Sequence, residues 1–221
     1  MKLIEENIKQ KYENRLNSLE IKIEKLEEKL EKLENQNEQI DSKIFKSKKD
    51  LSFLNEKLEN DFNGKIKYNL IYRATRDGPK TSDFNRKCNR HNNQLIILKT
   101  TKGLIFGGYT GRGFQNTNNG AIKDDTVFLF SFDTKKIYNI KKGSDALYEY
   151  SLNNFGIFFG KSDGNNPIYL GWGNADMLTN NNNSTCRISN EEFEFTKDYE
   201  LNNGEENFTL EEIEVFSINN I

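Results

Sequence analysis

Cysteine, histidine and proline are scarce in this sequence, and the scarcity of histidine and cysteine limits the metal sites that it can form. The 221 residues include one histidine, two cysteines and two prolines. A lone His91 excludes any metal site built on a pair of histidines. Cys88 and His91 have a C-x-x-H spacing, but no two further ligands are evident, so we expect no metal site. Cys88 and Cys186 are expected to be free thiols in a cytoplasmic protein.

Long apolar runs and an excess of either charge are also missing. No stretch of eighteen apolar residues exists, which excludes a membrane-spanning helix, and the first residues lack the apolar core of a signal peptide. The formal net charge is -2. Such a balance gives no attraction toward nucleic acid or an anionic membrane surface. We therefore expect a cytoplasmic protein that has no membrane span and does not bind nucleic acid.

Glycine is absent from the first quarter of the chain and frequent afterwards. All 15 glycines and both prolines lie from Gly64 onward, where aromatic residues also become common. This change of composition predicts a boundary at residues 61–64. The expected organisation is a coiled coil over residues 1–63 and a globular domain over residues 64–221.

The first part carries a heptad repeat. With Leu16 at position a, eleven of the thirteen core positions are leucine or isoleucine, and a period of 3.5 residues held this long is typical of a coiled coil. The a positions are Leu16, Ile23, Leu30, Asn37, Ile44, Leu51 and Leu58. The d positions are Leu19, Leu26, Leu33, Ile40, Ser47 and Leu54. We expect one continuous helix whose last two heptads are looser or lean on the second part.

The residues that flank this seam favour a parallel homodimer. Between parallel chains in register, cations at g face carboxylates at e five residues later, and a polar residue at a, here Asn37, typically specifies register. The facing pairs are Arg15 with Glu20, Lys22 with Glu27, and Lys29 with Glu34. A trimer, an antiparallel pair, or a single helix packed on the second domain are the alternatives.

The second part is dominated by short strands. Apolar runs bounded by turn residues predict about nine strands and one or two short helices, which indicates an α+β fold with two antiparallel sheets packed as a sandwich. A helix after Thr81 or Ser82 would place Phe84 and Cys88 on one face. The expected strands lie at 69–73, 95–98, 104–109, 126–132, 137–140, 155–159, 168–171, 186–189 and 213–218.

The stretch KGLIFGGYTGRGF, residues 102–114, has the glycine content of a phosphate-binding loop. A loop of that type needs a lysine followed by serine or threonine, and then a helix whose N-terminus faces the anion. Neither follows Gly113. We therefore interpret Gly107 and Gly108 as positions where the strand bends or another element approaches closely, and Arg112 as a surface charge on a mobile tip.

Candidate catalytic groups are few. Asp124 and Asp125 precede the most apolar strand, and we expect them to have structural partners. The alternative function is a weak hydrolase or a metal-dependent enzyme that uses Asp124, Asp125 or Glu214. Carboxylates without a histidine or lysine partner, however, seldom act as catalytic acids or bases. Trp172, between two glycines, is expected to plug the core or cover a sheet.

Six segments of the second part resemble a TLDc domain in order. The pattern Phe-Gly-Gly-Tyr at 106–109 is its best marker, and the resemblance extends over residues 66–221. The six segments are NLIYRATRDG (69–78), FNRKC (84–88), LIILKTTKGLIFGGYT (95–110), DDTVFLFSF (124–132), FGIFFGKSD (155–163) and EEIEVFSI (211–218).

The resemblance implies two face-to-face antiparallel sheets with flanking helices, and no established catalytic activity or cofactor. It also implies a role in protection against oxidative damage, or in regulating the vacuolar proton pump (V-ATPase) through protein binding. On that basis we expect a non-enzymatic interaction module that dimerises through its coiled coil. An oxidation-response role acting through Cys88 or Cys186 is a further hypothesis, although packing in the core is the expected role of both cysteines.

Overall fold

The computed structural model describes most of the chain as two compact units. It describes residues 2–115, 120–149, 156–160, 168–170, 175–179, 184–185, 192–195, 200–205 and 207–221. One unit comprises Met1–Ile40 with Phe45–Leu51, and the other comprises Asp41–Ile44 with Ser52–Ile221. The first unit is helical, and the second is an α+β unit that contains both sheets.

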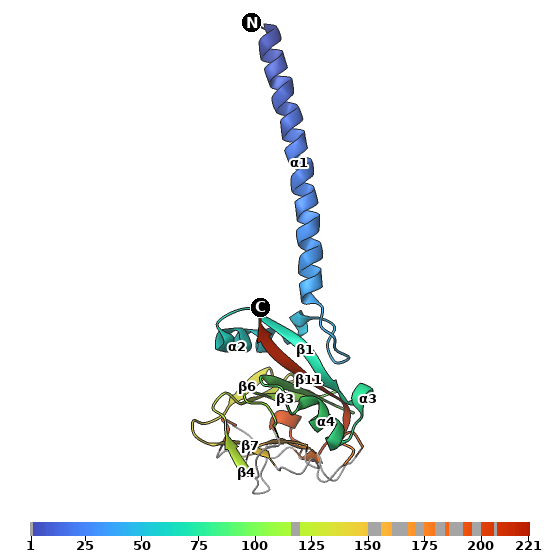
Figure 1. Cartoon of the computed structure of the whole chain (residues 1–221), viewed down its shortest axis with the longest axis vertical. Coiled ribbons are helices and arrows are strands. Elements are labelled where there is room, and N and C mark those ends of the chain that lie inside the picture. Colours follow the sequence, from blue (N-terminus) through green and yellow to red (C-terminus); the bar gives the residue numbers. More distant parts are fainter. Residues whose placement is uncertain are drawn as a thin grey trace. The chain divides into compact units, whose positions relative to one another are not determined.

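Helix α1 (Lys2–Glu38) is a single uninterrupted helix in the first unit (Figure 1). Within this helix, the apolar side chains of the heptad pattern whose burial is described are largely exposed. Leu16, Leu19, Ile23, Leu26 and Leu30 are between 48% and 63% exposed. No helix in the described part of the chain combines the length and the hydropathy that crossing a bilayer requires. An exposed apolar stripe of this kind is typical of an interaction surface.

The heptad pattern predicted one continuous helix through Leu58, but α1 ends at Glu38. Tertiary hydrogen bonds explain the early end. In a continuing helix the Lys43 N–H would bond to the carbonyl four residues earlier. Instead it donates to the carboxylate of Glu214 at 2.8 Å, and Ser42 donates its hydroxyl to the same carboxylate. Contacts with the sheet unit therefore override the local helical pattern at residues 41–44.

The last two predicted heptads belong to a separate helix. A 3-10 turn η1 (Lys48–Leu51) precedes helix α2 (Ser52–Phe62). Leu54 and Leu58 of α2 are fully buried, which confirms the expectation that this region leans on the second part of the chain. Phe53 packs against Phe132 with a ring-centroid distance of 4.7 Å. The apolar period of α2 therefore serves the core of the sheet unit, where the sequence pattern predicted a coiled-coil seam.

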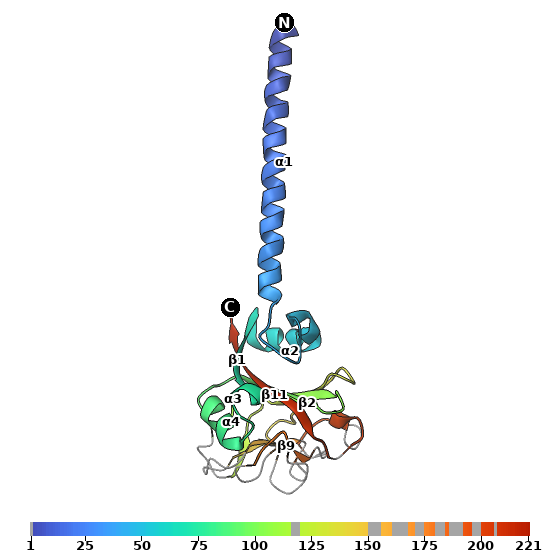
Figure 2. The same cartoon turned by 90° about the vertical axis from the view of Figure 1, so that its right-hand side faces the viewer.

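The larger sheet has six strands in the order β1-β11-β2-β3-β5-β6, and every neighbouring pair is antiparallel. The longest strand, β11, lies between β1 and β2 and reaches the C-terminal residues (Figure 2). Its register aligns Val215 with Ile96 of β2. The strand bounds are β1 (Ile66–Arg73), β2 (Gln94–Thr100), β3 (Ile105–Thr110), β5 (Phe128–Ser131), β6 (Lys136–Asn139) and β11 (Leu210–Asn220).

The second sheet has five strands in the order β10-β9-β8-β7-β4, again antiparallel. Its strands are β4 (Gly120–Lys123), β7 (Asp145–Glu149), β8 (Ile157–Phe159), β9 (Ile168–Leu170) and β10 (Ser184–Thr185). Fully buried residues of both sheets, such as Leu129 and Phe159, belong to one hydrophobic cluster. The two sheets therefore share a core, and burial of this apolar surface is the main stabilising contribution.

Two short helices follow β1. Helix α3 (Ala74–Asp77) and helix α4 (Thr81–Cys88) lie beside each other near one end of the larger sheet (Figures 1 and 2). Phe84 and Cys88 are fully buried on one face of α4, as predicted. Thr81 is the first residue of the helix and therefore not its cap. The N-cap residue is Lys80, which makes no side-chain capping bond.

Eight of the nine predicted strands correspond to β1, β2, β3, β5, β6, β8, β9 and β11, although their bounds shift by a few residues. The ninth, at 186–189, lies outside the described residues. The sequence pattern missed β4, β7 and the two-residue β10. Strands β4 and β7 are four and five residues long and belong to the smaller sheet, where few apolar residues alternate.

Candidate functional site

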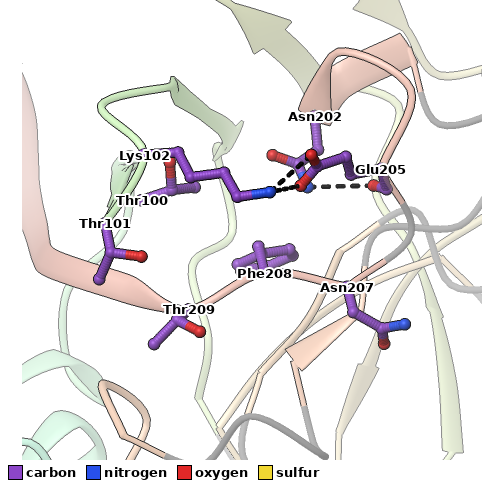
Figure 3. A pocket seen from close by; sticks show the side chains of 8 residues that line it. All are labelled: Thr100, Thr101, Lys102, Asn202, Glu205, Asn207, Phe208 and Thr209. Atoms are coloured by element: carbon purple, nitrogen blue, oxygen red, sulfur yellow. Dashed lines mark hydrogen bonds and ion pairs between the residues drawn. The ribbon is translucent and has the colours of Figure 1, made fainter.

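A cavity of about 240 Å³ lies where the β2–β3 turn meets the segment between η2 (Glu200–Asn202) and β11. We call it the hairpin pocket. Eight residues line it: Thr100, Thr101, Lys102, Asn202, Glu205, Asn207, Phe208 and Thr209 (Figure 3). The lining combines threonine hydroxyls, two amides, one cation, one carboxylate and one aromatic ring.

An ion pair joins the two sides of the pocket. The Lys102 ammonium lies 2.6 and 2.7 Å from the two carboxylate oxygens of Glu205. Figure 3 shows the Lys102 side chain extending from the hairpin toward Glu205 and Asn202. The two charged side chains are 66% and 46% exposed. A pair this exposed contributes at most about 1 kcal/mol to stability, so it can open at little cost.

Asn202 presents an unsatisfied acceptor in this pocket. The residue is 1% exposed, and its Nδ2 donates to the Glu205 carbonyl at 3.0 Å. The Glu205 N–H donates back to the Asn202 carbonyl at 3.1 Å. Asn202 Oδ1, however, is buried and has no hydrogen-bond partner among the described residues. A buried acceptor left without a donor costs about 1–3 kcal/mol, so its persistence calls for a physical explanation.

Hydrogen bonds and a ring contact hold the segments around the pocket in place. The Thr101 N–H donates to the Thr209 carbonyl at 2.9 Å, which joins the hairpin to the start of β11. Thr100 is buried, and its hydroxyl accepts a bond of 3.0 Å from the Leu104 N–H. Phe208 stacks edge-on against Phe106 with a centroid distance of 5.1 Å. The walls of the hairpin pocket are therefore held by contacts that need no ligand.

A second cavity of about 440 Å³ lies between α2 and the larger sheet. Its side chains are mostly engaged with one another. Lys57 pairs with Asp61, and the Tyr109 hydroxyl donates to Asn93 Oδ1 at 3.2 Å. Burial, followed by the negative charges of Asp124 and Asp61, raises the pKa of Tyr109, which keeps this hydroxyl protonated. This cavity contains no buried unpaired atom comparable with Asn202 Oδ1 among its described lining residues.

The glycine-rich stretch is structural, as predicted. Gly107 and Gly108 lie inside β3, where a side chain has no room. A Cβ atom on Gly107 would lie 2.0 Å from the Ile96 carbonyl oxygen. One on Gly108 would lie 2.6 Å from the Phe159 ring of the other sheet. Close approach, the second of the two predicted reasons for these glycines, is therefore confirmed.

The prediction for Arg112 was wrong. Its guanidinium lies 2.7 Å from the carboxylate of Glu149, whose side chain is 0% exposed. The Gln115 N–H donates to the same carboxylate at 2.8 Å. A buried carboxylate requires a charged partner, so Arg112 holds the end of the glycine stretch against β7. The sequence could not reveal this pair, because β7 itself was not predicted.

Asp124 and Asp125 have structural partners, as expected. Asp124 accepts hydrogen bonds from the Thr110 hydroxyl at 2.8 Å, from the Arg112 N–H at 3.2 Å and from Thr126. Asp125 accepts from the Gly143 N–H at 2.9 Å. These bonds shape two loops.

Glu214 lies within β11, opposite Arg73 in the β1–β11 register, and is fully buried. It pairs with Arg73 at 2.7 Å and also accepts from residues 42 and 43. Burial lowers the pKa of Arg73, but hydrogen bonds to Glu214 and Asp41 outweigh burial and leave that pKa raised. Glu214 thus has its own set of partners, and the structure does not bring Asp124, Asp125 and Glu214 together in one site.

Cys88 is fully buried, and burial raises the pKa of its thiol well above the ordinary value. A thiolate is the reactive form, so this environment disfavours redox chemistry at Cys88. His91 contacts Cys88 only through a backbone bond from its N–H to the Cys88 carbonyl at 3.0 Å among the contacts described. The described residues hold no group of three potential metal ligands. Cys186 and Trp172 lie outside the described residues.

Sequence reasoning missed the hairpin pocket. Asn202 and Phe208 lie in a polar stretch between strands. The amino-acid sequence there does not distinguish a buried asparagine from an exposed one. Thr101 and Lys102 belong to the turn that the sequence predicts at residues 101–103. Only the pairing of β2 with β11 brings these two segments together, so no local motif could have revealed the pocket.

Comparison with known protein families gives a match. A family model described as the TLDc domain matches residues 39–219. The match begins one residue after α1 ends and includes α2, both sheets and the hairpin pocket. A comparison with curated proteins finds no match.

Proposed function

Since the chain belongs to the TLDc domain family, as residues 39–219 show, we propose that it is a non-enzymatic protein-interaction module. In this proposal, α1 pairs in parallel with α1 of a second copy, and the dimer presents two TLDc domains to a partner protein in the cytoplasm. The domain match supports a role in protein interaction or in a stress response. The partner and the oligomeric state are our proposal.

The exposed stripe on α1 is the observation that carries the dimer. Leu16, Leu19, Ile23, Leu26 and Leu30 are each about half exposed, and all five occupy a or d positions. Burying the exposed half of one such side chain contributes about 1 kcal/mol. Ten of them, five from each chain, contribute roughly 10 kcal/mol, against an association cost of about 4–15 kcal/mol. The stripe can therefore supply much of the free energy that association of two chains requires.

Docking on a protein partner is the second part of the proposal. The domain resemblance points to subunits of the vacuolar proton pump, and to protection against oxidative damage as the resulting benefit. Two linked domains would bind an oligomeric partner with greater avidity than one domain, provided that the spacing of the two sites allows both to engage.

The alternative of a weak hydrolase or metal-dependent enzyme receives less support. Asp124 and Asp125 accept bonds that shape loops, and Glu214 is buried against Arg73. A catalytic carboxylate needs access to substrate and a matched partner. Our proposal of a non-enzymatic role is supported by these engagements, and an activity assay with chelator and metal controls would test it.

A matched pair of substitutions tests the dimer. Ile23→Asp places a charge at an a position of the seam, and Ile21→Asp places the same charge at an f position on the opposite side. The two isoleucines are 53% and 52% exposed, so the change in surface polarity is the same. Light scattering of the full chain at micromolar concentration should give twice the chain mass for wild type and Ile21→Asp, and the monomer mass for Ile23→Asp.

The same three proteins test the partner. Immobilised wild type and Ile21→Asp should retain proton-pump subunits from a lysate, and Ile23→Asp should retain less because bivalency is lost. A wild-type mass of one chain would refute the dimer, and three chain masses would favour the trimer. Absence of pump subunits from all three eluates would refute the choice of partner while leaving the dimer standing.

A further inference from the structure

We propose that the hairpin pocket binds a neutral, hydroxyl-rich molecule, namely a sugar or another polyol. The pocket has a volume of about 240 Å³ and lies in the part of the chain that matches the TLDc domain. This inference goes beyond the proposed interaction role, and it rests on the residues of the pocket alone.

The unpaired oxygen of Asn202 indicates that the pocket lacks a hydrogen-bond donor. Oδ1 is a buried acceptor, and no donor in the described part of the chain reaches it. The Nδ2 of the same amide is already used in a bond to the Glu205 carbonyl, so the side chain cannot turn over to exchange the two groups without losing that bond. A ligand that satisfies this site must therefore donate a hydrogen bond.

The charges of the pocket favour a neutral ligand. Lys102 and Glu205 neutralise each other across the opening, at 2.6 and 2.7 Å. An anion would have to compete with Glu205 for the ammonium, and a cation would have to compete with Lys102 for the carboxylate. A hydroxyl group can instead donate to the Asn202 oxygen and accept from the Lys102 ammonium at the same time, without separating two charges.

The remaining lining residues suit a ring that carries several hydroxyls. Thr101 and Thr209 supply hydroxyls on one side of Phe208, and Asn202 and Glu205 lie on the other (Figure 3). Thr101, Asn202 and Glu205 can exchange hydrogen bonds with ligand hydroxyls, and Phe208, which is 7% exposed, adds an apolar edge to the wall. One water would satisfy Asn202 Oδ1, but the volume exceeds the roughly 30 Å³ that one water occupies.

The walls of the pocket are already in place, which reduces the cost of binding. The Thr101 N–H bonds to the Thr209 carbonyl, and the Asn202–Glu205 turn is closed by two hydrogen bonds. The Lys102–Glu205 pair at the opening is exposed and weak, so a ligand hydroxyl can share the ammonium with Glu205 at little cost. A site whose backbone is fixed in advance loses little conformational entropy when it binds.

Backbone amide NMR of the full chain tests the proposal. Glucose, mannose, galactose and myo-inositol are titrated separately to about 50 mM, which would saturate a site with a millimolar Kd. Tetrahydropyran serves as a ring of similar shape without hydroxyls. At least one polyol should give saturable shifts confined to residues 100–102 and 202–209, and tetrahydropyran should give none. The lack of residue-specific shifts with all four polyols, or equal shifts with tetrahydropyran, would overturn the proposal.

Two substitutions locate the site. Thr101→Val removes a hydroxyl from the pocket while keeping the shape of the side chain, and it should weaken polyol binding about fivefold. Thr134→Val makes the same change at the exposed turn before β6 and should leave binding unchanged. Asn202→Leu should abolish binding. Its fold is checked from the dispersion of the amide spectrum, and binding that survives in a folded Asn202→Leu variant would contradict the assignment.

The source of the sugar is settled by a second titration. The monosaccharide that binds best is compared with the oligosaccharide that carries it at its non-reducing end. Tighter binding of the monosaccharide indicates a free metabolite, and tighter binding of the oligosaccharide indicates a glycan. Either result supports the pocket as a polyol site, whereas binding of the oligosaccharide with shifts only outside residues 100–102 and 202–209 would refute it.

Discussion

The backbone N–H of Lys43 donates a hydrogen bond of 2.8 Å to the side chain of Glu214, 171 positions later in the sequence. The same carboxylate accepts from Ser42 and pairs with Arg73. The segment that follows α1 is thereby fastened to β11 of the sheet unit. Because Glu214 is fully buried, its negative charge depends on these three donors for its stability.

Removing Glu214 should therefore be costly. Glu214→Ala leaves the Arg73 guanidinium, whose side chain is 10% exposed, without its closest partner. We expect the free energy of unfolding to fall by about 3–5 kcal/mol. Urea denaturation followed by circular dichroism measures the change. The control is Glu211→Ala, which removes an exposed partner of Lys99 and should cost less than about 1 kcal/mol. Equal losses from both variants would contradict the role assigned to Glu214.

Alanine at the paired glycines of β3 should distort the sheet. In Gly107→Ala the new Cβ meets the Ile96 carbonyl, which is backbone and cannot rotate away, and in Gly108→Ala it meets the Phe159 and Leu129 side chains. We expect a loss of at least about 1–3 kcal/mol for each, with the larger loss at Gly107. Gly64→Ala, where nothing lies within 4 Å, should be neutral or slightly stabilising. Thermal denaturation of the three variants checks this order, and the reverse order would refute it.

Arg112 should matter for stability despite its place in a glycine-rich stretch. Arg112→Met keeps most of the aliphatic side chain but leaves the buried Glu149 carboxylate without its cation. We expect a loss of about 3 kcal/mol. Arg90, which is exposed, provides the control. Arg90→Met should change stability by less than about 0.5 kcal/mol. If guanidinium chloride denaturation gave matching midpoints for the two variants, Arg112 would be a free surface charge after all.

The thiol of Cys88 should be unreactive in the folded protein. The residue is 0% exposed, and burial raises the pKa of its thiol. The thiolate fraction at mildly alkaline pH is therefore smaller than that of an ordinary cysteine. In a Cys186→Ser background, iodoacetamide should modify Cys88 only after denaturant is added, as measured by mass spectrometry of the intact chain. Rapid modification of the native protein would revive the hypothesis of a redox-active Cys88.

The larger sheet could largely be predicted from the sequence because its signals are local. The turn at residues 101–103 between two apolar runs predicts the β2–β3 hairpin, and the phenylalanines of β5 predict a strand that is buried on both faces. The motifs in order also predicted the TLDc domain, which the family match confirms. In these segments, propensity, turn chemistry and tertiary structure agree.

The failures share one cause, namely contacts between residues far apart in sequence. The end of α1 depends on Glu214, the role of Arg112 depends on Glu149, and the hairpin pocket depends on the pairing of β2 with β11. The heptad pattern itself continues through α2, where Leu54 and Leu58 pack inside the sheet unit. A period in the sequence specifies an apolar face, but it does not specify which surface covers that face.

The central place of β11 also sets the timing of folding during synthesis. Strands β1 and β2 both pair with β11, so each keeps an unpaired edge until residues 210–220 have left the ribosome. Neither strand can complete its hydrogen bonds early, because their shared neighbour is made after every other strand that the structure describes. The six-stranded sheet therefore forms only after translation has passed β11, and a nascent chain stalled before Leu210 exposes unpaired sheet edges that are prone to aggregation.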